Sequence, residues 1–153
     1  MTTPEQRIAE LGLTIPDVVP PVAAYTPTVR TGDHVYVSGQ VPMVDGRPAG
    51  TGKVGAEVTP DRAAELAAIC ALNAIAAVKA EVGELSRVRR IVKVVGFVAS
   101  DPSFTGHPQV INGASELLGS VFGDAGVHAR SAVGVAALPL DVPVEVEMIV
   151  EVG

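Results

Sequence analysis

Arg130 and Glu145 are the two residues of this chain whose types and spacing best suit chemistry on a small molecule. An arginine binds a carboxylate through two parallel hydrogen bonds, and a glutamate can orient or deprotonate a water molecule. Together they suit the hydrolysis of a small substrate that bears a carboxylate. The simpler interpretation is an ion pair on a solvated surface, which is common and contributes about 0–1 kcal/mol.

Both residues lie on predicted strands, at 129–137 and 142–151, which we expect to form an antiparallel hairpin around Leu138-Pro139-Leu140-Asp141. In the register that the apolar residues favour, one face carries Val133, Val135, Val144, Val146 and Met148. The opposite face carries Arg130, Ala132, Gly134, Glu145 and Glu147. Arg130 and Glu145 are then about four residues apart along the strands, or roughly 13 Å. Either a ligand and water lie between them, or another chain completes the site.

Two helices are expected upstream of these strands. Thr59, Pro60 and Asp61 mark a helix start, because threonine caps, proline suits the first helical position and aspartate complements the helix dipole. This helix runs to about Val82 and is stopped by Gly83. The second helix spans about residues 108–122, and its apolar stripe consists of Val110, Ala114, Leu117, Leu118 and Val121.

Two further segments are typical of strands. Residues 34–44 are interrupted at Gly39 and Pro42 and are followed by an Asp45-Gly46 turn. Residues 88–99 are apolar on both faces, with Val92, Val94 and Val98 on one and Ile91, Val95 and Phe97 on the other. A strand of this kind is covered on both faces. One cover can be a helix, and the other would be a second helix or a neighbouring subunit. The element order predicts an α+β protein with two helices on one face of a sheet and Arg130 and Glu145 on the other.

The composition fits one domain over residues 1–153, with an N-terminal arm at 1–21, a core at 22–152 and a proline-rich entry segment at 15–22. Hydrophobic residues make up 48% of the chain, yet the apolar runs are interrupted within about ten residues, whereas a membrane span needs about twenty. The excess apolar surface is therefore expected to lie against another subunit, with no membrane partner. The single cysteine, Cys70, and the absence of an apolar leader predict a cytoplasmic protein.

The charge of the chain argues against a nucleic-acid partner. It carries 11 basic and 17 acidic residues, a net charge of −6, and only 3% aromatic residues for base stacking. The three histidines, His34, His107 and His128, lack the spacing of helical metal ligands, and one cysteine makes no zinc pattern. The glycines in the 45–56 loop lack the lysine of a phosphate loop and are expected in a mobile lid or connector. No metal and no cofactor are therefore expected.

Several short motifs, taken in order, resemble the signature of the RidA (YjgF) family. They are Ser38-Gly39-Gln40-Val41-Pro42, Asn112, Ala129-Arg130-Ser131-Ala132-Val133, Leu138-Pro139 and Val144-Glu145-Val146-Glu147. The resemblance covers about residues 22–152. Ser-Gly-Gln alone is a weak signal, but the ordered set of motifs is specific to the family. It implies an α+β chorismate-mutase-like fold with a mixed sheet, assembled as a homotrimeric barrel with ligand clefts between subunits.

The resemblance also implies a reaction, the hydrolytic deamination of reactive enamines or imines, such as 2-iminobutanoate, to 2-oxo acids and ammonia. By position, Arg130 would bind the substrate carboxylate and Glu145 would position or activate the attacking water. The backbone carbonyl of Ala132 would accept a hydrogen bond from the imine nitrogen. Three further residues would line the cleft: Tyr25, Gly39 and Asn112.

The sequence departs from the family pattern at Ala132, where many members have cysteine, so thiol modification is impossible there. Glu147 shares the predicted face of Glu145 and is a rival for its role. Three alternative functions stay open: a non-catalytic trimer that binds a small carboxylate, a pathway-specific deaminase, and an endoribonuclease. The acidic charge and sparse aromatic residues disfavour the endoribonuclease.

Overall fold

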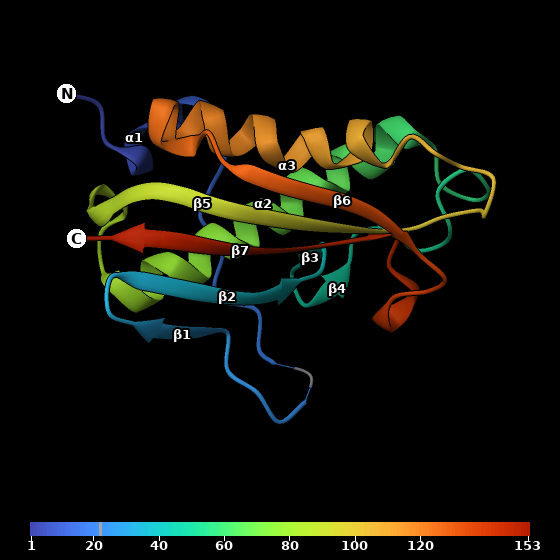
Figure 1. Cartoon of the computed structure of the whole chain (residues 1–153), viewed down its shortest axis with the longest axis horizontal. Helices are drawn as coiled ribbons and strands as arrows, with labels where there is room; N and C mark the ends of the chain where they lie inside the picture. Colours follow the sequence, from blue (N-terminus) through green and yellow to red (C-terminus); the bar gives the residue numbers. More distant parts are fainter. Residues whose placement is uncertain (22) are drawn as a thin grey trace.

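A computed structural model describes residues 1–21 and 23–153, which contain a mixed sheet covered on one face by two helices (Figure 1). The sheet order is β1 (Thr28–Thr31), β2 (His34–Gln40), β7 (Val144–Val152), β5 (Val88–Ala99) and β6 (Ala129–Val135). Only β5 and β6 are parallel; the other neighbours are antiparallel. The covering helices are α2 (Pro60–Val82) and α3 (His107–Phe122). This architecture confirms the predicted α+β class.

Both long helices begin and end where the sequence predicts. The Thr59 hydroxyl accepts a hydrogen bond from the Arg62 amide at 3.2 Å, Pro60 occupies the first helical position, and Gly83 ends α2 with a φ of 89°. By length and composition α2 could cross a membrane, but 61% of its apolar window is buried inside the domain. Its apolar character is therefore explained by packing between the sheet and α3.

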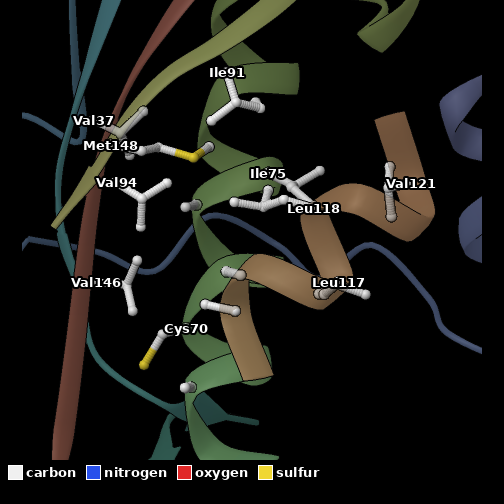
Figure 2. Close-up of a cluster of buried hydrophobic side chains, with 14 of the residues drawn as sticks. Val37, Cys70, Ile75, Ile91, Val94, Leu117, Leu118, Val121, Val146 and Met148 are labelled. Carbon is white, nitrogen blue, oxygen red and sulfur yellow. The ribbon is translucent and has the colours of Figure 1, made fainter. Parts of the chain in front are cut away.

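The core fills the space between the sheet and the two helices. Figure 2 shows side chains from β2, β5 and β7 pointing toward α2, with a second layer between α2 and α3. Cys70 is fully buried in this core, as expected for a small apolar side chain. At Gly113 of α3, a Cβ atom would collide with the Ala64 carbonyl oxygen of α2, so the two helices pack backbone to backbone at this point.

The predicted hairpin of the last two strands is wrong. β6 pairs in parallel with β5, and β7 lies on the other side of β5, between β5 and β2. A strand that follows a helical crossover returns parallel to the strand before it, so α3 brings β6 to the edge of β5. Every second residue of β7 is buried, which favours a central place with partners on both sides.

The alternation along β5 also differs from the prediction. A register shift between Ile91 and Lys93 moves Ile91 to the buried face, where it lies with Val94 and Val98. Val95 and Phe97 lie on the opposite face and are half-exposed. The second apolar face expected for this strand therefore exists, and it is open in the single chain.

The remaining elements are short. β3 (Met43–Val44) and β4 (Arg47–Pro48) form a short hairpin around the predicted turn at Asp45 and Gly46. Three 3-10 turns follow: η1 (Leu85–Arg87), η2 (Gly123–Gly126) and η3 (Pro139–Asp141). Near the N-terminus, α1 (Pro4–Glu10) packs on α3 through Ile8, which is 1% exposed. The part of the N-terminal arm before Leu11 is thus a helix anchored to the domain.

Candidate functional site

A cavity of about 540 Å³ lies beside β2 and β7 on the face of the sheet that the helices leave open. Its walls come from the segment that precedes β1 and from the η3 turn, and its lining includes Tyr25, Gly39, Glu145 and Glu147. Small-molecule sites in proteins have volumes of roughly 300–1,000 Å³. The cavity is therefore large enough for an amino-acid derivative.

A β-bulge in β2 shapes the floor of this cavity. Val37 pairs with Met148 whereas Gln40 pairs with Val146, so β2 contains one extra residue between these pairs. The bulge is held by a 2.6 Å hydrogen bond from the Ser38 hydroxyl to the Thr26 carbonyl. A second bond of 3.1 Å runs from Gln40 Nε2 to the Ser38 carbonyl. The sequence prediction of a break at Gly39 is confirmed.

Gly39 is required at this bulge because the Glu145 carboxylate lies against its backbone. A Cβ atom on residue 39 would collide with Glu145 Oε2. Only glycine leaves room for the carboxylate at this point. The bulge therefore sets where the Glu145 side chain lies in the cavity.

Two carboxylates share the cavity, since Glu145 and Glu147 are two residues apart on the same face of β7. Burial raises the pKa of the Glu145 carboxyl above its ordinary value, and the charge of Glu147 raises it further. A carboxyl with a raised pKa exchanges its proton closer to neutral pH, as a general acid or base requires. Glu145 therefore has the properties of a proton-transfer group.

Arg130 lies half-buried on the edge strand β6 and contacts α3. Its Nη1 donates to Asn112 Oδ1 at 2.7 Å and to Ser115 Oγ at 3.2 Å, and its Nη2 donates to the Pro108 carbonyl at 3.3 Å. These bonds use both protons of Nη1 and one of Nη2. Within residues 1–21 and 23–153 the Nε proton and one Nη2 proton have no acceptor, and both can donate to an anionic ligand. The guanidinium is thus fixed in place with two donors left for a ligand.

His128 holds the Ser115 hydroxyl that supports Arg130. Its Nδ1 is 2.6 Å from the Gly126 carbonyl oxygen and its Nε2 is 2.9 Å from Ser115 Oγ. Because a carbonyl oxygen only accepts, Nδ1 carries a proton, and Nε2 is hydrogen-bonded to the Ser115 hydroxyl. The sequence analysis did not identify Ser115, although its spacing of three residues from Asn112 on α3 places both on one helix face.

The structure divides the six predicted site residues into two groups. Tyr25 and Gly39 lie with Glu145 at the cavity, whereas Asn112 lies with Arg130. Ala132 follows on the same face of β6 as Arg130, paired with Gly96.

The predicted shared face of Arg130 and Glu145 is wrong. Arg130 pairs with Val94 of β5 and Glu145 with Phe97, so their side chains leave opposite faces of the sheet, roughly 14 Å apart at the backbone. The error follows from the hairpin that the chain does not form. One small ligand cannot contact both residues within a single chain.

The titratable side chains of the described residues do not suggest a metal site. In residues 1–21 and 23–153, no three His, Cys, Asp or Glu side chains come together as metal ligands would. The only carboxylates that line the cavity within this part of the chain are Glu145 and Glu147.

Comparison with known proteins identifies close relatives over the whole chain. The sequence model described as "YjgF/chorismate mutase-like, putative endoribonuclease" matches residues 5–152. Protein TCP17 of Trypanosoma cruzi is 43% identical over 96% of this chain and 92% of its own length. A crystal structure of a protein of unknown function from Agrobacterium tumefaciens is 47% identical, with a TM-score of 0.93 over 99% of this chain and 94% of that one.

A crystal structure from Shewanella oneidensis, named a "putative endoribonuclease", is 34% identical, with a TM-score of 0.96 over 98% of this chain and 99% of that one. More distant solved structures carry the names RidA, YjgF and endoribonuclease L-PSP. The similarity thus extends over nearly all of the chain and includes both groups of site residues.

Proposed function

The chain belongs to the YjgF/chorismate-mutase-like family, and from this premise we propose that it hydrolyses reactive imines or enamines of amino acids to 2-oxo acids and ammonia. The observation that carries the proposal is the half-buried Glu145 carboxyl, with its raised pKa, at a cavity of about 540 Å³. A proton-transfer group at a cavity of this size suits the addition of water to a small substrate.

The proposed reaction adds one water molecule to the C=N carbon and releases the nitrogen as ammonia. The Glu145 carboxylate takes a proton from water while the water oxygen bonds to the carbon of the protonated imine, which gives a neutral carbinolamine. Glu145 then returns that proton to the nitrogen, the C–N bond breaks and ammonia leaves, and the carbinolamine hydroxyl becomes the carbonyl of the 2-oxo acid as its proton passes to the Glu145 carboxylate. The two remaining donors of Arg130, on Nε and Nη2, bind the substrate carboxylate.

We further propose that three copies form a barrel with their open sheet faces inward, so that Arg130 of one copy reaches the Glu145 cavity of the next. Two observations support this assembly. Arg130 and Glu145 leave opposite faces of their own sheet. The open face also carries half-exposed apolar side chains, among them Val95, Phe97 and Val133, which a neighbouring subunit could bury. The cleft between copies would then contain a carboxylate-binding arginine and a proton-transfer group.

The cavity is less suited to RNA, although the family description includes endoribonucleases. Its charged lining residues are Glu145 and Glu147, which repel the phosphates of a nucleic-acid backbone. The net charge of −6 on the chain also disfavours the binding of a nucleic acid. A zwitterionic amino-acid derivative fits this charge distribution better.

The proposal is tested by the release of ammonia from 2-iminobutanoate that a threonine dehydratase generates in situ. We expect the wild type to accelerate release above the spontaneous rate, and Glu145→Gln to lower kcat roughly 10²- to 10⁴-fold because the amide cannot transfer the proton. Arg130→Ala should raise KM through loss of the carboxylate-binding guanidinium. Glu147→Gln, on the same face, is the matched control and should retain most of the activity. Equal rates for wild type, Arg130→Ala and Glu145→Gln would refute the proposal.

A further inference from the structure

The η3 turn holds two consecutive non-glycine residues in the left-handed backbone region. Leu140 has φ 60° and ψ 17°, and Asp141 has φ 55°. Aspartate adopts this conformation with some ease, but a bulky leucine does so only where its surroundings impose it. Backbone strain of this kind is a reason to look for a role at the residue that bears it.

Contacts from a distant loop hold the turn in this conformation. Lys53 Nζ forms a 2.5 Å ion pair with Asp141 Oδ1, and the Gly52 amide donates to the Asp141 carbonyl at 2.8 Å. Within the turn, the Asp141 amide donates to the Leu138 carbonyl at 3.2 Å. The 45–56 loop, which the function described so far does not use, therefore fixes the position of Leu140.

The strained backbone presents Leu140 to the cavity and not to the core. Its side chain is 53% exposed and lines the Glu145 cavity beside Pro139. The N-terminal arm adds further apolar lining, including Val19, Pro20 and Pro21. Burial of an apolar group against these residues is favourable, whereas a third carboxylate near Glu145 and Glu147 is repelled.

The geometry points to Leu140 as a specificity-determining residue, with Lys53 and Asp141 as its positioning residues. Leu140 in this position favours substrates derived from amino acids with extended apolar side chains, such as leucine, over those derived from alanine or glutamate. This inference rests on the proposed function in that it assigns the substrate class of the same cavity.

The test compares kcat/KM for imines that an amino-acid oxidase generates in situ from leucine, alanine and glutamate. We expect the wild type to prefer the leucine-derived over the alanine-derived imine by roughly tenfold or more. Leu140→Asn keeps a residue that tolerates the left-handed region but removes the apolar contact, and should reduce this ratio roughly 5- to 10-fold. Lys53→Met should also reduce the ratio of kcat/KM for the leucine-derived imine to that for the alanine-derived imine. Leu11→Asn, at a leucine that is 48% exposed outside the cavity, is the control and should leave the ratio unchanged.

Calorimetric measurements of 4-methyl-2-oxopentanoate and pyruvate binding distinguish a failure of this inference from a failure of the proposed function. If no imine is turned over but the wild type binds 4-methyl-2-oxopentanoate more tightly, and Leu140→Asn removes that preference, the inference holds and the proposed function fails. If imines are turned over with the same selectivity in wild type and Leu140→Asn, the inference is overturned while the proposed function stands. If neither 2-oxo acid binds and no imine is turned over, both are overturned.

Discussion

Glu145 is maintained in a state that costs the folded protein some stability at neutral pH. Its carboxyl is half-buried and shares its face with Glu147, and both effects raise its pKa above the ordinary value near 4.5. Because the folded state then binds the proton more tightly than the unfolded state, the contribution of this group to stability is greatest below the ordinary pKa. It declines as the pH rises through the raised value. Such a cost is common where a residue serves chemistry and not packing.

The raised pKa gives a prediction for the pH dependence of the reaction. In the proposed reaction the unprotonated Glu145 takes the proton from water, so kcat/KM should fall as the pH drops through the raised pKa, at a higher pH than an ordinary glutamate would give. Glu147→Gln removes a neighbouring negative charge and should move this acid limb to lower pH. The measurement is a pH–rate profile of both proteins. An acid limb that Glu147→Gln does not move would show that another group controls it.

At the scale of the elements, the bulge in β2 determines where the Glu145 carboxylate lies. Gly39→Ala should displace the Glu145 side chain, because the new Cβ would collide with Oε2, and should lower kcat roughly 10- to 100-fold. Stability should change little, since a mobile carboxylate can move aside. Circular dichroism and the imine assay together check this expectation.

Gly119→Ala is the matched control for this substitution. Nothing lies within 4 Å of a Cβ at this position in α3, so alanine should add about 0.5–1 kcal/mol of helix stability and leave the activity unchanged. An activity loss in Gly119→Ala as large as that in Gly39→Ala would remove the special role assigned to the bulge.

The sequence predicted local structure well and long-range pairing poorly. The limits of α2 and α3, the break at Gly39 and the Asp45-Gly46 turn all follow from short-range chemistry, such as the cap at Thr59 and the stop at Gly83. The pairing of β6 could not be predicted in this way, because two sequential apolar strands favour a hairpin unless the helical crossover before them is considered. The wrong pairing then placed Arg130 on the wrong face.

The identities of the site residues came from the ordered motifs and not from periodicity. The resemblance selected Arg130, Asn112, Gly39 and Glu145, and the structure places each of them beside another member of the set. It could not select Ser115 or Leu140, which no motif marks. Ser115 contacts His128. Leu140 is positioned through its neighbour Asp141, which Gly52 and Lys53 of a distant loop bind.

At the scale of the whole molecule, the proposed trimer predicts complementation between two impaired variants. At substrate concentrations below the wild-type KM, Arg130→Ala and Glu145→Gln should each show little activity, but trimers of the proposed kind, refolded from an equal mixture, should contain clefts with both wild-type residues. Random mixing gives about one quarter of such clefts, so about one quarter of the wild-type activity should return. The imine assay on the mixture measures it, with each variant refolded alone as the control. No recovery in mixed trimers would contradict a cleft shared between copies.

The position of β7 has a consequence for how the protein is made. β7 is the last strand in the sequence, yet it lies in the middle of the sheet and separates β2 from β5. While the chain is still emerging from the ribosome, the β1–β2 hairpin and the β5–α3–β6 unit have no strand to join them. The strand edges of both that pair with β7 stay unpaired until residues 144–152 have emerged. Chaperone contact during synthesis should therefore concentrate on the edges of β2 and β5 that β7 finally occupies.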